Sequence, residues 1–266
     1  QPCALLCAAP PERLRPHASH KGSYGDVAVI GGAPGMAGAA LLAARAALHR
    51  GAGRVFVGFL DSDAPALDAQ QPDLMVRPWD SLDLHDLTVA CGCGGGEAVR
   101  LALPRALNAR ALVLDADALN ALAADAQLQG LLAARGRRGA PTVLTPHPLE
   151  AARLLELDTA TVQANRLNAA RELARKFASV VVLKGSGSVI AGPDGALRIN
   201  PTGNARLAIA GTGDVLAGMV AARLASGEDA FEAASAAVYL HGLAADRWAE
   251  GLPLTASGLA SMSLRA

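Results

Sequence analysis

Aromatic side chains are scarce in this sequence, and neither sign of charge is in excess. Its 266 residues include 2 Trp, 2 Tyr and 4 Phe, and Ala, Leu and Val supply most of a hydrophobic fraction of 52%. The 24 Lys and Arg residues balance 24 Asp and Glu residues, without a run of like charges. This balance argues against a nucleic acid or another polyanion as the partner. The basic cluster of Arg135, Arg137 and Arg138 is therefore interpreted as the solvated end of a helix.

Cysteine is also rare, and its spacing does not match a common zinc site. Cys3 and Cys7 form a CxxxC pair, and Cys91 and Cys93 form a CxC pair. A chain of this length can bury a substantial core, so it needs no disulfide or structural metal. We expect Cys91 and Cys93 to be small residues at the end of a strand, and the protein to be cytoplasmic.

One long run lacks charge, but its composition does not favour a membrane span. Residues 27–44 are long enough to cross a bilayer. Several glycines and Pro34 interrupt the run, which indicates a strand, a glycine loop and the start of a helix. No charged start, apolar run and cleavage site open the chain, so no secretory signal is predicted.

Short apolar stretches alternate with helical ones after a Pro-rich segment. Residues 1–25 are expected to be an irregular arm, and residues 26–266 a single α/β domain. Strands are predicted at 26–32, 54–60, 87–91, 111–114, 142–144, 180–183, 188–191 and 196–199. Helices are predicted at 38–50, from about 97, after 117, at 148–155, at 161–177 as one helix, and, closing the chain, from about 213 and 229. Apolar strands without alternation indicate a mainly parallel central sheet flanked by helices.

Ligands of such sheets bind beyond the carboxyl ends of the strands. The most informative segment near these ends is Gly211-Thr212-Gly213-Asp214, which opens an apolar helix. Its glycines let backbone N–H groups approach an anion, and the helix N-terminus adds unpaired donors. Asp214 could accept a proton from a substrate hydroxyl, or it could merely cap the helix.

Two further segments could hold a nucleotide or could be ordinary turns. Lys184-Gly185-Ser186-Gly187-Ser188 follows a buried strand and offers a cation, backbone donors and two hydroxyls. It is not a P-loop, because GxxxxGK[ST] is absent. Residues 92–96 would bring backbone close to a ligand, or would form a tight turn.

Three side chains at other strand ends are also candidates. His147 stands between two prolines, whose rings restrict the backbone and fix the direction of the imidazole, so we expect it to contact a ligand. Asp115 and Asp117 either cap a helix or hold water or Mg²⁺ near phosphates.

Together, the motifs resemble those of a known family. They are KGSYGDVAVIGG at 21–32, GMAGAALLAARAALHRGAGRV at 35–55, VLDADALNAL at 113–122, LTPHPLEAARLL at 144–155, VVLKGSGSVI at 181–190 and AGTGDVLAGMVAA at 210–222. Their order and spacing resemble the carbohydrate-kinase-like domain of ADP-dependent NAD(P)H-hydrate dehydratases, over nearly the whole chain. The resemblance implies a ribokinase-like three-layer sandwich.

The resemblance also implies a reaction and its residues. A phosphoryl group from ADP activates the ring hydroxyl of hydrated NADH or NADPH, and phosphate is then eliminated to give AMP and the restored cofactor. Asp214 would be the base, with Gly211, Thr212 and Gly213 as the anion hole; Ala39, Gly94, His147 and Asp214 would contact the hydrated dinucleotide; Lys184, Gly185, Ser186, Gly187, Ser188 and Gly213 would bind ADP; and Asp115, Asp117 and Asn204 are candidates for contacts with phosphate or Mg²⁺-bound water.

Further partners are implied in the same way. Mg²⁺ would accompany the phosphates without a direct protein ligand, and the protein would be a homotetramer. An epimerase, fused or separate, would interconvert the two forms of the hydrate. A fused one would suit the Gln at the first position.

The chain departs from the family pattern at two loops. Residues 203–214 read GNARLAIAGTGD where the family usually has GNPGMATGGTGD, and residues 92–96 read GCGGG instead of GPGLG. Two alternatives stay open, the first because other enzymes share the fold and a GxGD motif, and the second because the 203–210 loop is altered. One is a small-molecule kinase of the ribokinase-like fold, and the other is a nucleotide-binding protein with weak catalysis.

Overall fold

A ten-stranded sheet runs through the computed structural model, which describes residues 3–12 and 15–262. Its order is β1-β10-β9-β8-β7-β6-β5-β2-β3-β4. The strands are β1 Leu5–Leu6, β2 Asp26–Gly31, β3 Arg54–Phe59, β4 Met75–Val76, β5 Thr88–Cys91, β6 Ala111–Leu114, β7 Thr142–Leu144, β8 Val180–Leu183, β9 Val189–Ala191 and β10 Leu197–Ile199. All neighbours pair in parallel except β8–β9 and β9–β10, so the predicted mainly parallel sheet and hairpin are confirmed.

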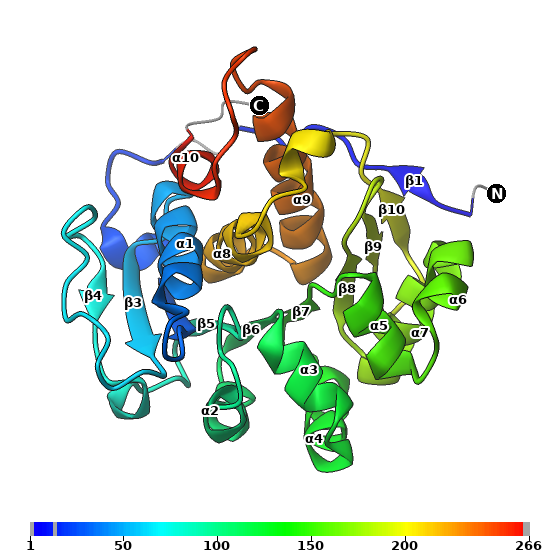
Figure 1. Cartoon of the computed structure of the whole chain (residues 1–266), viewed down its shortest axis with the longest axis horizontal. Helices are drawn as coiled ribbons and strands as arrows, with labels where there is room; N and C mark the ends of the chain where they lie inside the picture. The colour runs from blue at the N-terminus through cyan, green and yellow to red at the C-terminus, as the bar shows by residue number, and fades with distance from the viewer. Residues whose placement is uncertain (1–2, 13–14, 263–266) are drawn as a thin grey trace.

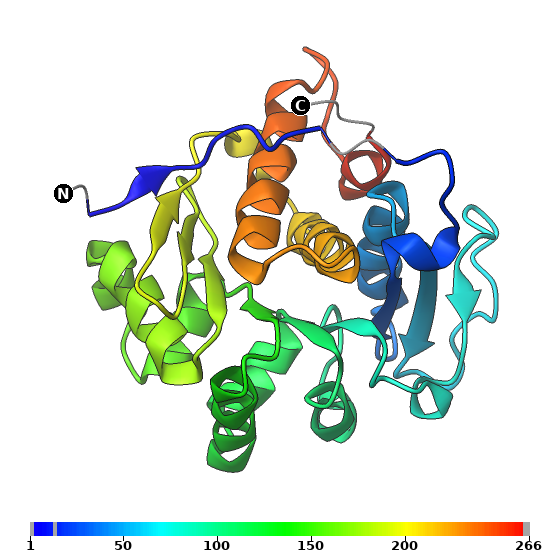
Figure 2. The ribbon, with the colours of Figure 1, turned by 180° about the vertical axis from the view of Figure 1, so that it is seen from behind.

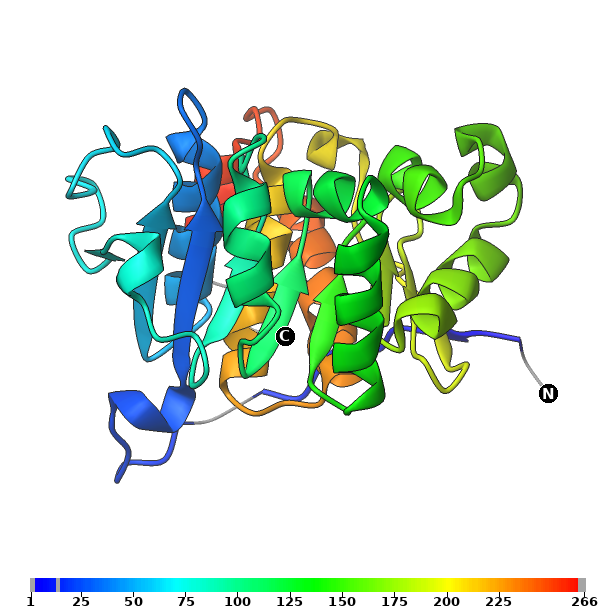
Figure 3. The same ribbon diagram turned by 90° about the horizontal axis from the view of Figure 1, so that it is seen from below.

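Helices cover both faces of this sheet. They are α1 Ala37–His49, α2 Val99–Ala106, α3 Asp117–Ala123, α4 Ala126–Arg137, α5 Pro148–Leu155, α6 Thr159–Ala164, α7 Arg166–Phe177, α8 Thr212–Ala225, α9 Ala230–Asp246 and α10 Ala256–Ser261. Helices α1, α8, α9 and α10 lie on one face, and α2–α7 lie on the other (Figure 1). Figure 3 looks onto the second layer, with the sheet behind it. The result is the predicted three-layer sandwich.

The sequence of β2 explains why both faces must be covered. Val27 and Val29 belong to the core beneath α1 and α8, whereas Ala28 and Ile30 belong to the core beneath α2 and α3. All four side chains are fully buried. A strand without a polar face is stable only between two helix layers. None of the helices in the described part of the chain combines the length and the hydropathy that a membrane span requires.

Some expected elements differ in the structure. The predicted helix at 161–177 is two helices, because Asn165 leaves the helical conformation (φ −142°, ψ 64°) and its side chain accepts a hydrogen bond from Asn168 N at the start of α7. The segment expected to be an irregular arm contributes β1, which pairs with β10 at one sheet edge. From behind, this strand lies far from the η1 turn (Lys21–Tyr24) that precedes β2 (Figure 2). A third helix, α10, follows the two expected at the end of the chain.

The interpretation of the basic cluster was wrong for Arg135. Arg137 and Arg138 are exposed, but Arg135 is 2% exposed. Its guanidinium donates to the carbonyls of residues 107, 109, 110 and 141 and to the hydroxyl of Thr142. Burial lowers the pKa of Arg135 to about 10, so it stays charged at neutral pH. Five donors in a rigid fork make Arg suited to binding several carbonyls at once.

Candidate active site

Four of the predicted segments meet where parallel strands end and α8 begins. Residues 92–96 follow β5, Asp115 follows β6, His147 follows the end of β7, and Lys184 follows β8. The N-terminus of α8 faces the same edge of the sheet (Figure 1). A Cβ atom placed on Gly213 would lie 3.3 Å from Lys184 Nζ and 3.7 Å from Asp115 Oδ2. The glycine thus lets the helix N-terminus approach these two charged groups closely.

Lys184 and Asp115 form a largely buried ion pair across this edge. Lys184 Nζ lies 2.6 Å from Asp115 Oδ1, and the side chains are 20% and 2% exposed. Burial by itself lowers the pKa of Lys184, but the charges of Asp115 and Glu150 outweigh it, so its pKa is raised. Lys184 therefore remains a cation, which suits it to phosphate.

The possibility that Asp115 or Asp117 caps α3 was wrong. The N-cap residue of α3 is Ala116, and no side chain makes a capping hydrogen bond there. Instead, Asp117 Oδ2 accepts a hydrogen bond from Gly96 N at 2.8 Å, which ties the glycine loop at 92–96 to α3.

Asp214 occupies the first turn of α8 without capping it. The N-cap residue is Gly211, in the left-handed conformation (φ 90°), and no side chain caps the helix. Burial, followed by the negative charge of Asp115, raises the pKa of Asp214 to about 6, while a hydrogen bond from Cys93 and the charge of Lys184 oppose the rise. A carboxylate with this pKa is ionised at neutral pH and is a stronger base than an exposed aspartate.

The sequence did not point to His241, which holds the start of α8 in place. His241 is 8% exposed, and its Nε2 lies 2.9 Å from Thr212 O. Burial lowers the pKa of His241 to about 4, so the imidazole is neutral and Nε2–H donates to this carbonyl. The Thr212 hydroxyl in turn lies 2.9 Å from Leu207 O and 3.1 Å from Ile209 O.

A cavity of about 430 Å³ lies between the Lys184 segment and α8. Residues 184–188, Thr212 and Gly213 supply polar groups to its wall, and Leu207, Leu216 and Val238 supply apolar ones. A cavity with both polar and apolar lining groups can hold a phosphate chain and a base together.

Asn204 also lines this cavity, with its side chain engaged by the protein. Asn204 Nδ2 donates to Asp246 Oδ1 at 2.9 Å, and Asn204 Oδ1 accepts from Arg206 N at 3.0 Å.

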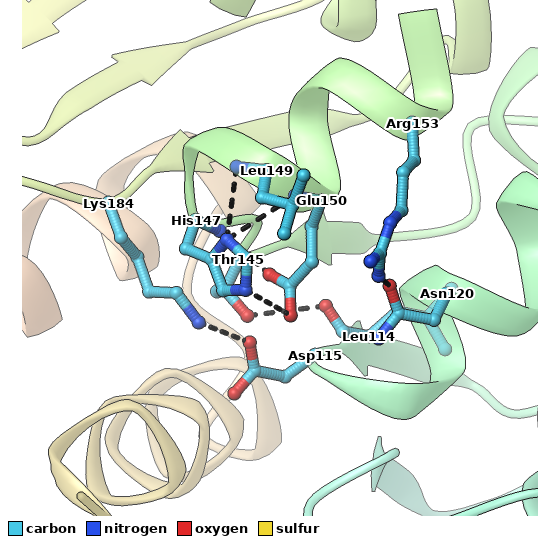
Figure 4. A network of polar contacts seen from close by, with 9 residues as sticks. All are labelled: Leu114, Asp115, Asn120, Thr145, His147, Leu149, Glu150, Arg153 and Lys184. Atoms are coloured by element: carbon cyan, nitrogen blue, oxygen red, sulfur yellow. Dashed lines mark hydrogen bonds and ion pairs between the residues drawn. The ribbon is translucent and has the colours of Figure 1, made fainter. Parts of the chain in front are cut away.

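His147 is fixed by its own helix rather than by the prolines alone (Figure 4). Its Nδ1 accepts from Leu149 N at 3.1 Å and Glu150 N at 3.3 Å, and its Nε2 lies 3.3 Å from Glu150 Oε1. Burial and then Lys184 lower the pKa of His147, so the ring is neutral. Because both ring nitrogens are engaged, the imidazole offers a ligand its ring face and carbon edge.

Ala39 and Gly94 lie against each other near the start of α1. Gly94 has a φ of 59°, and a Cβ placed on it would lie 2.8 Å from Met36 O and 2.9 Å from Ala39 Cβ. Gly94 O accepts a hydrogen bond from Ala33 N at 2.7 Å, so the loop after β5 is tied to the end of β2.

The cysteines are only partly what their spacing indicated. Cys91 and Cys93 are buried small residues at the end of β5, as expected. However, Cys93 Sγ, an oxygen of Asp115 and an oxygen of Asp214 lie within 4.8 Å of one another, which the spacing did not predict. No sequence pattern signals this cluster, because its members come from three distant segments.

Comparisons with known proteins identify the family of the chain. A model of the NAD(P)H-hydrate dehydratase family matches residues 27–262. The ADP-dependent (S)-NAD(P)H-hydrate dehydratase of Neisseria meningitidis serogroup B is 44% identical over 256 residues, which cover 93% of this chain and 85% of that protein. The bifunctional NAD(P)H-hydrate repair enzyme of Escherichia coli K12 is 40% identical, and the match covers 86% of this chain and 44% of that protein. The chain thus spans about half the length of this bifunctional relative.

Solved structures separate this family from the kinases. The ADP/ATP-dependent NAD(P)H-hydrate dehydratase of Bacillus subtilis, co-crystallised with ATP and Mg²⁺, is 33% identical with a TM-score of 0.78 and covers 93% of this chain and 90% of its own. The pyridoxal kinase of Staphylococcus aureus, 17% identical with a TM-score of 0.55 and covering 88% of this chain and 94% of its own, shares the fold alone. With the family pattern matched over most of its length, the chain belongs to the NAD(P)H-hydrate dehydratases.

Proposed function

We propose that this protein dehydrates hydrated NADH and NADPH with ADP as co-substrate, and so repairs the nicotinamide cofactors. The observation that carries the proposal is the position of Asp214. It lies in the first turn of α8, beside the Lys184–Asp115 ion pair and next to the cavity that suits a nucleotide. Its pKa of about 6 suits a base that must be ionised at neutral pH.

In the proposed reaction, Asp214 accepts the proton of the ring hydroxyl while the hydroxyl oxygen attacks the terminal phosphorus of ADP. AMP leaves, and Lys184 balances the charge on the phosphates. The first intrahelical bond of α8 runs from Val215 N to Gly211 O, so the N–H groups of residues 212–214 point out of the helix toward an anion. The ring carbon–oxygen bond then breaks, phosphate departs with the electron pair, and loss of a proton from the neighbouring carbon restores the double bond.

The substrates are proposed to bind on two sides of Asp214. Residues 184–188 and Gly213 hold ADP in the cavity, and Gly211, Thr212 and Gly213 form the anion hole. Ala39, Gly94 and His147 contact the hydrated dinucleotide. The engaged ring nitrogens of His147 favour a packing contact with the substrate over a hydrogen bond.

The residues at the strand ends fit a Mg²⁺ ion carried by the phosphates. Asp115 Oδ2 faces the Gly213 position, and Asp117 uses one carboxylate oxygen for Gly96 N. Carboxylate oxygens suit the water shell that Mg²⁺ retains. With Asn204, these residues would hold its water or a phosphate oxygen, without a direct protein ligand. The ion would neutralise phosphate charge when bound. We also propose a cytoplasmic homotetramer that acts with an epimerase.

The test is recovery of the near-ultraviolet absorbance of reduced nicotinamide from hydrated NADH, with Mg²⁺ and either ADP or ATP. Recovery with ADP would support the dehydratase. A stable phosphorylated product without recovery would indicate a kinase instead. ADP binding without either product would indicate a nucleotide-binding protein with weak catalysis.

Asp214→Asn should abolish this recovery, because an amide cannot accept the proton. The expected loss of kcat is about 1,000-fold, typical of a lost general base. Calorimetry should find ADP binding within about twofold of the wild type, since residues 184–188 are untouched. Asp158→Asn is the control. Asp158 is the N-cap residue of α6, and Asn serves equally well as an N-cap. Near-normal turnover of Asp214→Asn would remove Asp214 from the base role.

A further inference from the structure

Cys93 places a buried thiol against the carboxylate of Asp214, and the proposed reaction gives this thiol no role. The side chain is 0% exposed. Its Sγ lies within 4.8 Å of a carboxylate oxygen of Asp214 and of one of Asp115, and a thiol at this place can donate to the Asp214 carboxylate. The family pattern usually has Pro at this position, and Pro carries no side-chain donor. The contact with Asp214 therefore depends on the Cys that this chain has at position 93.

The backbone holds the thiol where it is. Cys93 O accepts a hydrogen bond from Gly32 N at 3.0 Å, and the next carbonyl, of Gly94, accepts from Ala33 N at 2.7 Å. Both bonds tie the loop after β5 to the end of β2. The side chain belongs to the core formed with Val215 of α8, the residue after Asp214. The donor and its acceptor are thus held by two packed elements.

The groups around Asp214 explain why a neutral donor matters there. Asp115 from the end of β6 and Asp117 from α3 face it with like charge, and Lys184 from the end of β8 faces it with opposite charge. Lys184 is already paired with Asp115 at 2.6 Å. The Cys93 thiol adds a donor without adding a charge that phosphate would have to displace.

We propose that Cys93 is a positioning residue for the base. Its S–H group holds one oxygen of the Asp214 carboxylate, orients the other toward the substrate hydroxyl and favours the ionised carboxylate. The inference rests on the proposed function only where it assigns a substrate to Asp214. The contact itself can be tested without substrate.

The experiment compares Cys93→Ala and Cys93→Ser with Cys91→Ala. Cys91 is a matched control, because its side chain is also buried, at 1% exposed. Burial alone raises the pKa of the Cys91 thiol. The first measurement is a ¹³C NMR titration of the Asp214 carboxyl carbon in the free protein, assigned with Asp214→Asn. Cys93→Ala should raise the midpoint by roughly half a pH unit to one unit, the equivalent of one modest hydrogen bond. Cys91→Ala should leave it unchanged, and Cys93→Ser should keep it at or below the wild-type value.

The second measurement is the pH profile of kcat/KM for the dehydration. In Cys93→Ala the acid limb of the profile should shift to higher pH in step with the NMR midpoint. At pH values below the limb, kcat/KM should fall about fivefold, and at pH values above it kcat/KM should be near that of the wild type. A general packing defect would lower the rate equally at all pH values.

Each outcome decides one point. Equal midpoints in Cys93→Ala and Cys91→Ala would overturn the positioning role. The NMR midpoint of Asp214 could shift while the acid limb of the pH profile does not. That result would support the contact between Cys93 and Asp214 but would overturn Asp214 as the base, so only the proposed function would fail. If Cys93→Ala does not fold, Cys93→Ser decides, because a raised midpoint in that variant overturns the inference.

Discussion

At the scale of single residues, the environment of Glu150 has the clearest consequence for how the stability of the protein depends on pH. It is 3% exposed beneath His147, and its Oε2 accepts a hydrogen bond from His147 N at 2.7 Å. Burial raises the pKa of Glu150 to about 7, and the charge of Asp115 adds to the rise, while Lys184 and the His147 N–H oppose it. The folded protein thus binds this proton more tightly than the unfolded chain does.

The raised pKa of Glu150 makes the stability of the protein depend on pH. A carboxyl group whose pKa is raised on folding stabilises the protein below its unfolded pKa, and this stabilisation is lost as the pH rises through about 7. The free energy of unfolding should therefore fall between pH 5 and pH 8, by at most about 3 kcal/mol from Glu150. Asp214, whose pKa is also raised, contributes with the same sign at lower pH.

Glu150→Gln should flatten this dependence, because the amide does not titrate. Urea denaturation at the two pH values would measure the slope. Glu97→Gln is the control, since the Glu97 side chain is 91% exposed and should leave the slope as it is. Equal slopes in Glu150→Gln and the wild type would contradict the role of Glu150.

At the scale of elements, the N-terminus of α8 depends on the loop before it. Residues 203–210 include the η3 turn (Ala205–Leu207) and form one wall of the cavity. The Thr212 hydroxyl holds this loop through Leu207 O and Ile209 O, and His241 holds the Thr212 carbonyl. The loop that departs from the family pattern is thus anchored by a residue of the unaltered GTGD segment.

Thr212→Val should loosen the cavity wall that residues 203–210 form. The substitution keeps the shape of the side chain but removes the donor, which costs about 1 kcal/mol. We expect ADP affinity to fall about fivefold if that cost appears in binding. Thr212→Ser keeps the hydroxyl and should bind ADP nearly as the wild type does. Calorimetric titration with ADP measures both variants, and unchanged affinity in Thr212→Val would show that the loop needs no anchor.

At the scale of the whole molecule, Arg135 joins the second helix layer to the sheet at the edge opposite the candidate site. Its partners precede β6 and β7, at the amino ends of strands whose carboxyl ends lead to Asp115 and His147. Loss of the guanidinium would leave several buried carbonyls without a hydrogen-bond partner, and each such carbonyl destabilises the folded protein.

Arg135→Met should therefore lower the free energy of unfolding by about 3 kcal/mol or more. Turnover per folded molecule should not change, because the site lies at the other end of the strands. Arg137→Met is the control, since Arg137 is exposed and should cost less than about 0.5 kcal/mol. Denaturant unfolding and an activity assay at low temperature would measure the two effects. A stability equal to that of the control would contradict the clamp.

Much of the fold could be predicted from local sequence. Apolar runs such as Val180–Leu183 have no polar face, so they predict buried parallel strands. The motifs at the strand ends predicted which segments would meet at one edge of the sheet, because parallel strands bring their carboxyl ends together there. The break at Asn165 could not be predicted from periodicity, since a side-chain cap there outweighs a continuous amphipathic pattern.

Hydrophobic pattern and motif order are local properties of the chain, and they specify the parallel sheet, the family and the segments that meet at the candidate site. The state of each charged group, in contrast, depends on the folded arrangement. Arg135 is a clamp rather than a solvated charge, Asp115 is paired with Lys184 rather than a cap, and the Cys93 thiol lies beside the carboxylates of Asp115 and Asp214. Burial and distance set these states, and both depend on residues that are far apart in the chain.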